Sequence, residues 1–221
     1  MEHKTIAIAE QIFEQLEGEI LSGAYERGEI LTETKLSEKL GVSRTPIREA
    51  LRRLDQEHII KMTTKGAYVL GITMQDIEDI YAIRLRIEGW AAGLAAKRAS
   101  DEQIEKLKET VELQEFYTQK GDADNIKNMD STFHRLIYYM TGSTPVYDTL
   151  VPLHKRIIKY RKASVSHTSR AQDSLKEHKA IYEAIARRDA ELAEKLLNEH
   201  LHKALNNICL LYTSIHSKGC L

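Results

Sequence analysis

The stretch from Thr32 to Arg53, TETKLSEKLGVSRTPIREALRR, constrains the fold more than any other part of the chain. Its apolar residues recur at helical spacing in two short segments, and only Gly41, Val42 and Ser43 separate them. Gly41 can take the left-handed conformation that ends a helix, and Ser43 can cap the amides that begin the next one. Two helices joined by a tight turn are therefore predicted.

The second of these helices is expected to have a basic outer face. Its inward side is apolar, and its outward side carries Arg44, Thr45, Arg48 and Arg52. The surrounding residues 35–65 hold eight Lys or Arg against four Asp or Glu, a net charge of +4, although the whole chain of 221 residues carries −1. Such a helix is typical of one that enters a DNA major groove. The alternative is an ordinary helical hairpin with a solvated basic face.

Two β-rich runs follow, over residues 59–63 and 67–70, around a turn that contains Lys65 and Gly66. This pattern predicts a β-hairpin. Together with a helix expected over residues 6–21, the two-helix unit and the hairpin form a winged helix. The tip of its wing is expected to lie along the DNA backbone or minor groove.

The remainder of the chain shows helical periodicity without any further strand pattern. Helices are expected over residues 74–98, 101–120, 123–141, 145–166, 170–188 and 190–210. The short loops between them predict an antiparallel all-α bundle, so the fold is mainly α. We therefore expect a winged-helix DNA-binding domain (1–72), an all-helical domain (73–211) and a C-terminal tail (212–221). Without a membrane-spanning run or a signal peptide, a cytoplasmic protein with no membrane partner is expected.

Four polar residues occupy helix positions where apolar residues are expected: Asp130, His134, His178 and His200. Asp130 and His134 are four residues apart and therefore share one helical face. His178 lies eleven residues before Asp189, at a predicted turn, and His200 lies eleven residues after it. Both histidines then stand about 16 Å from the turn, at about 1.5 Å per residue, and face each other across a helical hairpin.

Three imidazoles and one carboxylate can hold a divalent metal ion and leave room for a small carboxylate ligand. Zn²⁺ suits this set best, and Ni²⁺, Mn²⁺ and Fe²⁺ are further candidates. The alternative is that each histidine is a core residue hydrogen-bonded to a backbone carbonyl. A metal-dependent hydrolase uses a similar ligand set, but the sequence has no HExxH motif. We therefore expect that the protein is not an enzyme.

Residues 5–70 resemble the DNA-binding domain of the GntR family of bacterial transcription regulators, through the gapless run from Leu31 to Leu51. The resemblance implies that double-stranded DNA is the partner. Two positions differ from the family pattern. His58 stands where the family usually has glycine, and Thr34 stands where some members place a DNA-contacting arginine.

The second domain resembles the FadR-type effector domain, FCD, the all-helical partner of one GntR subfamily. Its metal-binding positions match Asp130, His134, Glu177-His178 and His200. Many such domains bind a divalent metal and a small organic acid beside it, so the resemblance implies both ligands here. It also implies that Arg84 lines the effector pocket, with a surface ion pair to Glu88 as the alternative.

These features predict a homodimeric transcription regulator, in particular a repressor, that is controlled by an organic acid bound at the metal. Two recognition helices related by a two-fold axis would read the half-sites of a palindromic operator. A direct sensor of divalent metal is the alternative. The expected DNA contacts are Ser43, Arg44, Thr45, Arg48, Lys65 and Gly66.

Overall fold

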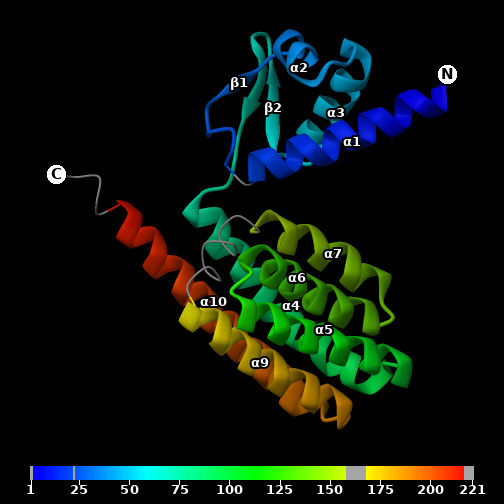
Figure 1. Cartoon of the computed structure of the whole chain (residues 1–221), viewed down its shortest axis with the longest axis vertical. Coiled ribbons are helices and arrows are strands. Elements are labelled where there is room, and N and C mark those ends of the chain that lie inside the picture. Colours follow the sequence, from blue (N-terminus) through cyan, green and yellow to red (C-terminus); the bar gives the residue numbers. More distant parts are fainter. Residues whose placement is uncertain (1, 22, 158–167, 217–221) are drawn as a thin grey trace. The chain divides into compact units, whose positions relative to one another are not determined.

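The computed structural model describes residues 2–21, 23–157 and 168–216 (Figure 1). The chain divides into two compact units, and the boundary falls between Thr73 and Met74. The predicted architecture is confirmed: a winged helix-turn-helix precedes an all-helical unit. None of the helices in the described part of the chain is long and apolar enough to cross a bilayer.

The N-terminal unit consists of α1 (Glu2–Leu21), β1 (Ile30–Leu31), α2 (Glu33–Leu40), α3 (Arg44–Gln56), β2 (Ile60–Thr63) and β3 (Gly66–Val69). Gly41 ends α2 in the left-handed conformation, with φ of 67°. Ser43 precedes α3 in an extended conformation but makes no side-chain capping bond, so that part of the prediction is wrong. A capping serine usually accepts from the second or third amide of the helix, and the third residue here is Pro46, which has no N–H.

The wing contains one strand more than the sequence predicts. β3 lies between β1 and β2 and pairs antiparallel with both (Figure 1). β1 has only two residues, too few to show a period of two. The backbone of β1 passes so close to Gly66 that a Cβ there would lie 2.6 Å from the carbonyl oxygen of Leu31. Gly66, with φ of 134°, is therefore needed for strand packing.

His58, at the entry to the wing, has φ of 56°. It therefore keeps the left-handed backbone that a glycine adopts readily and that histidine tolerates better than most residues. The departure from the family pattern changes the side chain but retains the turn.

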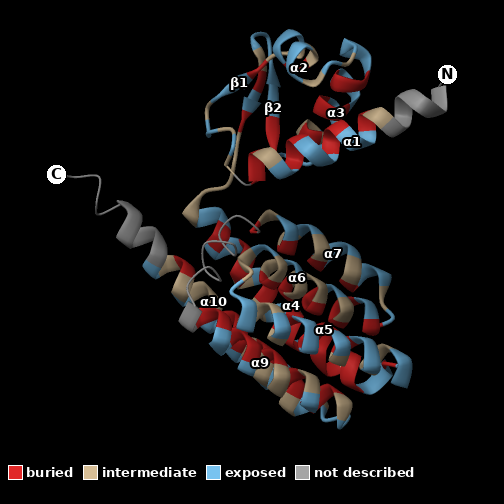
Figure 2. Cartoon of the chain, in the orientation of Figure 1, coloured by how far each residue is buried: buried red, intermediate tan, exposed pale blue. Residues whose placement is uncertain are grey.

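One apolar core holds this unit together (Figure 2). It joins the inner faces of α1 and α3 to the buried side of the sheet, and its fully buried members include Leu16, Ile47, Leu54, Ala67 and Val69.

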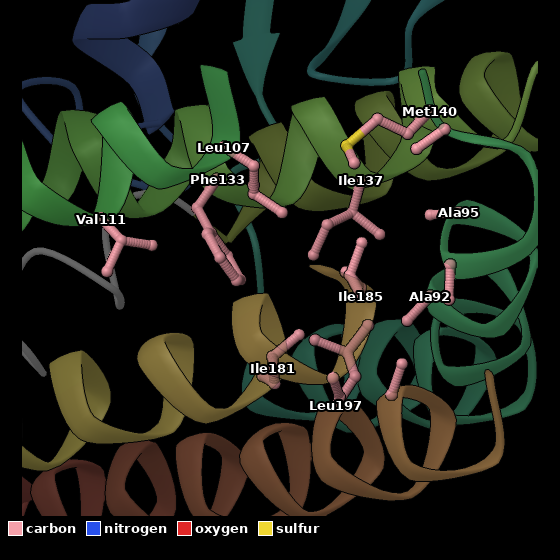
Figure 3. Close-up of a cluster of buried hydrophobic side chains, with 14 of the residues drawn as sticks. Ala92, Ala95, Leu107, Val111, Phe133, Ile137, Met140, Ile181, Ile185 and Leu197 are labelled. Atoms are coloured by element: carbon pink, nitrogen blue, oxygen red, sulfur yellow. The ribbon is translucent and has the colours of Figure 1, made fainter. Parts of the chain in front are cut away.

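The C-terminal unit consists of α4 (Met74–Arg98), α5 (Asp101–Lys120), α6 (Ala123–Met140), α7 (Thr144–Arg156), α9 (Thr168–Ala186) and α10 (Ala190–His216). Side chains from α5, α6, α9 and α10 converge in its core, as Leu107, Phe133, Ile181 and Leu197 show in Figure 3. α4 contributes mainly alanines to the same core, which allows the other helices to pack closely around it.

Two helix ends differ from the prediction. α7 ends at Arg156, whereas the predicted helix runs to residue 166; residues 158–166 lie outside the described part of the chain. α10 continues to His216, five residues into the segment expected to be a tail. The sequence contains no Gly or Pro between Ala190 and Gly219, so nothing in this segment breaks the helix.

Candidate functional site: a DNA-reading face and a histidine cage

The outer face of α3 presents three of the predicted DNA contacts. Arg44, Thr45 and Arg48 are exposed, while Ile47 and Leu51 on the opposite side are buried. The helix is therefore anchored on its apolar side and offers its basic side to a ligand. Ser43 and Lys65 are also exposed, whereas Gly66 is half-buried.

Arg48 forms an ion pair with Glu33. Its Nε and Nη2 donate to the Glu33 carboxylate at 2.8 and 2.7 Å. The hydrogen bond from Arg48 lowers the pKa of the Glu33 carboxyl and keeps it ionised. Because the pair is exposed, a DNA phosphate or a base edge can compete with Glu33 for the guanidinium.

Arg53 belongs to another face of α3. It forms an ion pair with Glu10 and lies over the ring of Phe13, 4.0 Å from its centroid. The charge of Arg53 is therefore balanced by α1, and this residue does not add to the basic outer face. The wing is tied to α3 as well, since the Met62 amide donates to Asp55 at 2.8 Å.

In the C-terminal unit, the four predicted metal ligands come together from three helices. Asp130 and His134 lie on α6, His178 on α9 and His200 on α10, and all four are buried. One candidate ligand atom from each lies within 4.8 Å of those from the other three. We call these four residues the histidine cage.

The ring geometry shows how closely the cage is assembled. The centroids of His178 and His200 are 4.7 Å apart, as expected for partners facing each other across the hairpin. The centroid of His134 lies 5.4 Å from that of His178 and 5.2 Å from that of His200. Asp130 Oδ1 is 3.6 Å from Nε2 of His178. Asp189, at the turn, accepts from the Leu192 amide at 3.0 Å and caps α10.

Each imidazole of the cage is held from behind by a polar side chain at its Nδ1 atom. The pairs are Glu88 with His134 at 2.5 Å, Gln114 with His178 at 2.7 Å, and Glu177 with His200 at 2.8 Å. With Nδ1 bound in this way, Nε2 is the atom that would bind a metal ion, and metal-binding histidines are usually held by such partners. The alternative of core histidines predicted backbone carbonyls as partners, and side chains occupy these positions instead.

Glu88 connects the cage to Arg84. Burial alone would raise the pKa of the Glu88 carboxyl, but Arg84 and His134 hold it well below its usual range. Arg84 is itself 1% exposed, so the predicted surface ion pair is a buried one. Sequence reasoning did not single out Glu88 as a partner of the cage.

Glu177 holds His200 on the outer side of the cage, as Glu88 holds His134. Its carboxylate accepts from Arg170 at 3.0 and 2.9 Å and lies 3.3 Å from Nζ of Lys203. These residues line a polar surface pocket of about 450 Å³ between α9 and α10. Glu177 therefore reaches His200 with a carboxylate whose position is fixed by two cations.

A second polar group adjoins the cage. His154 on α7 is buried, and its ring centroid lies 5.0 Å from that of His134. Its Nδ1 lies 3.3 Å from the hydroxyl oxygen of Tyr138. Burial lowers the pKa of His154 well below its ordinary value, so the ring is neutral. Tyr160, considered alongside His154 from the sequence, lies outside the described residues.

The cage has the features of a metal site. Nε2 of His134 is fully buried and has no hydrogen-bond partner within the described ranges. A buried polar atom of that kind is costly unless something binds it. A neutral nitrogen beside a carboxylate, held in place by a second ring of side chains, is a donor set that suits a divalent cation.

Each of the two units matches a known protein family. Residues 8–69 match the family "Bacterial regulatory proteins, gntR family", and residues 79–203 match the FCD domain. The chain is 26% identical over 205 residues to the HTH-type transcriptional repressor RspR of Escherichia coli, covering 92% of this chain and 90% of that protein. It is 30% identical over 191 residues to the gluconate operon transcriptional repressor of Bacillus licheniformis, covering 84% and 79%.

The fold agrees with this family. The solved structure of E. coli McbR/YncC superposes with a TM-score of 0.79 at 22% identity, covering 93% of this chain and 98% of that one. The relatives are transcription regulators, so the hydrolase interpretation falls away and the protein is not an enzyme. The chain therefore belongs to the GntR family of bacterial transcription regulators, with an FCD domain behind its DNA-binding domain.

Proposed function

We propose that this regulator is a homodimeric repressor whose binding to a palindromic operator is controlled by a small organic acid bound at a metal ion. The observation that carries the proposal is the histidine cage, in which Asp130, His134, His178 and His200 converge in the bundle of a DNA-binding protein. Both named relatives above are repressors, which supports the direction of control. The regulator is proposed to act in the cytoplasm, where it binds DNA.

The DNA-binding surface is proposed to combine α3 with the wing. Arg44 and Arg48 are assigned to bases or phosphates, and Thr45 and Ser43 to phosphates at the start of the helix. Lys65 at the wing tip adds a charge for the backbone, beside Gly66. Since Glu33 holds Arg48 in the free protein, operator binding starts from that ion pair.

The cage is proposed to hold Zn²⁺, with Ni²⁺, Mn²⁺ or Fe²⁺ as possible occupants of the same ligands. Bound there, a divalent ion supplies a positive centre that attracts a carboxylate. Asp130 contributes the charged ligand, and the imidazoles of His134, His178 and His200 contribute neutral ones. Arg84 is proposed to line the effector pocket, two hydrogen bonds away from His134 through Glu88.

A dimer is proposed because a single recognition helix reads only one half-site. Helix α4 offers an apolar surface for it. Ile83 and Trp90 are 42% and 49% exposed, and the half-buried Ile87 and Leu94 lie on the same helical stripe. Trp90→Glu is therefore expected to shift the protein toward monomer in analytical ultracentrifugation.

The decisive experiment measures operator binding by fluorescence anisotropy. The operator is first selected from a pool of random DNA duplexes. Release of the operator on adding an organic acid at constant zinc would support control by an effector. Release on changing zinc alone, with no response to acids, would instead identify a direct metal sensor.

The DNA-binding assignment has its own test in the same assay. Arg44→Ala and Arg48→Ala are each expected to lose about 1 to 3 kcal/mol of operator affinity if the side chain reads a base. Arg86→Ala, an exposed arginine of α4, serves as the matched control and should bind normally. Unchanged binding by both α3 variants would refute the assignment.

A further inference from the structure

We infer that Glu33 is a positioning residue for DNA recognition: it holds the guanidinium of Arg48 from one side, so that the free end of that group reads a guanine in the major groove. The inference rests on the proposed function, since it takes the contact between Arg48 and the operator as given. It adds the base that Arg48 reads, and it assigns a role to an acidic residue beside the DNA-binding face.

The contact between Arg48 and Glu33 uses only one side of the guanidinium. Nε of Arg48 donates to Oε1 of Glu33 at 2.8 Å, and Nη2 donates to Oε2 at 2.7 Å. An arginine has five N–H donors, so three remain. One N–H of Nη1 and the second N–H of Nη2 form another pair of parallel donors at the end of the group. DNA can compete with Glu33 for the bound donors, but it can also bind this free end and leave the ion pair in place.

The two helices that carry the pair determine which end is free. Glu33 is the first residue of α2, and Arg48 lies on the exposed face of α3. The side chain of Arg48 is 60% exposed and that of Glu33 is 26% exposed. The carboxylate is therefore the inner partner, and the end of the guanidinium that is turned away from it faces the solvent from which DNA approaches.

The pair also prepares Arg48 for binding. A free arginine side chain loses rotamer freedom when it binds a base, which weakens the contact. Arg48 is already held at two points, across the two helices of the helix-turn-helix. An exposed ion pair contributes little to folding stability. Its main effect is therefore expected in recognition, where a pre-organised side chain binds more tightly.

The charge of the pair favours a base over a phosphate. The hydrogen bond from Arg48 lowers the pKa of the Glu33 carboxyl, and the charge of Arg44 acts in the same direction. The carboxylate is thus ionised at neutral pH, and its pair with Arg48 is neutral. A neutral pair attracts a phosphate less than a free arginine does, because the carboxylate repels the phosphate.

The shape of the free end selects guanine among the bases. Two parallel donors need two neighbouring acceptors. In the major groove, guanine presents O6 and N7, whereas adenine pairs one acceptor with a donor, thymine has one acceptor beside a methyl group, and cytosine has a donor. Guanine is therefore the base that satisfies both free donors of Arg48 at once.

Modified bases test the inference with full-length protein and the selected operator, by fluorescence anisotropy. Each guanine in turn is replaced, in both half-sites together, by 7-deazaguanine, which lacks the N7 acceptor. Hypoxanthine is the matched control, because it keeps O6 and N7 and lacks only the amino group in the minor groove. At one position 7-deazaguanine is expected to weaken wild-type binding at least about 5-fold, with no such loss in Arg48→Ala. An operator without a guanine whose effect depends on Arg48 overturns the inference.

Glu33→Ala tests the positioning role, because it leaves Arg48 in place. The effect of 7-deazaguanine at that position is expected to fall to about 2-fold or less, and binding to a scrambled duplex should strengthen because the charge of Arg48 is no longer balanced. Glu33→Gln keeps one acceptor oxygen and should lie between the two. Glu38→Ala removes an exposed acid of the same helix and is the control, with the wild-type effect expected. An undiminished effect in Glu33→Ala overturns the role of Glu33.

The same measurements separate this inference from the proposed function. If Arg48→Ala loses operator affinity but no guanine effect depends on Arg48, the DNA-binding assignment stands and the inference fails. If Arg44→Ala and Arg48→Ala both bind the operator normally, the DNA-binding assignment itself fails, and the inference fails with it.

Discussion

Replacing Glu177 with alanine tests whether the cage is a metal site that depends on its outer side chains. Glu177 Oε2 holds Nδ1 of His200 at 2.8 Å, and Arg170 and Lys203 hold the carboxylate. Removing an outer partner of a metal ligand typically weakens metal binding 10- to 100-fold, which is about 1.4 to 2.7 kcal/mol. We expect a loss of that size for zinc, because His200 would be free to turn away.

Glu177→Gln provides a graded comparison. Its amide oxygen still accepts a hydrogen bond from Nδ1 of His200, so it is expected to lose less affinity than the alanine variant. Glu115→Ala is the matched control, since Glu115 joins Lys179 across α5 and α9 at 2.7 Å outside the cage. Zinc affinity is measured by competition with a chromophoric chelator, and circular dichroism verifies the fold. Wild-type affinity in folded Glu177→Ala would refute this account of the cage.

Three further predictions concern stability. Gly89→Ala should destabilise the bundle by about 1 to 3 kcal/mol in thermal unfolding, because its Cβ would lie 2.6 Å from Cγ of Asn198. The control is Gly18→Ala, on an open face of α1, which should stabilise the protein by up to about 1 kcal/mol. His58→Val should destabilise the winged helix by about 1 to 2 kcal/mol, while His58→Gly is tolerated in urea unfolding, since φ is 56°. Burial lowers the pKa of His154, so below pH about 6.5 the unfolded chain binds more protons than the folded one. The free energy of unfolding of the metal-free protein should therefore fall by up to about 1.4 kcal/mol for each pH unit below that value. His154→Leu should show a shallower slope, and an equal slope would contradict this assignment.

Helix geometry predicts the four residues of the cage as two pairs, and the resemblance to the FCD domain joins the two pairs into one site. A separation of four residues places Asp130 and His134 on one face, and equal distances from Asp189 bring His178 and His200 to one level. Both relations are local to one helix or one hairpin, so they do not depend on how the remaining helices pack.

The outer partners could not be found in this way. Gln114 reaches His178 across 64 residues, and Glu88 reaches His134 across 46. Such contacts depend on the rotation of whole helices about their axes, which no spacing rule supplies. The pairing of Arg84 with Glu88 followed from their separation of four, but its burial did not, because burial depends on the position of α4 within the bundle.

The three outer side chains come from three different helices: Glu88 from α4, Gln114 from α5 and Glu177 from α9. A mutation in any of these helices can therefore retune the centre without touching a ligand. The surroundings of the centre can therefore change one helix at a time while its four inner residues stay the same.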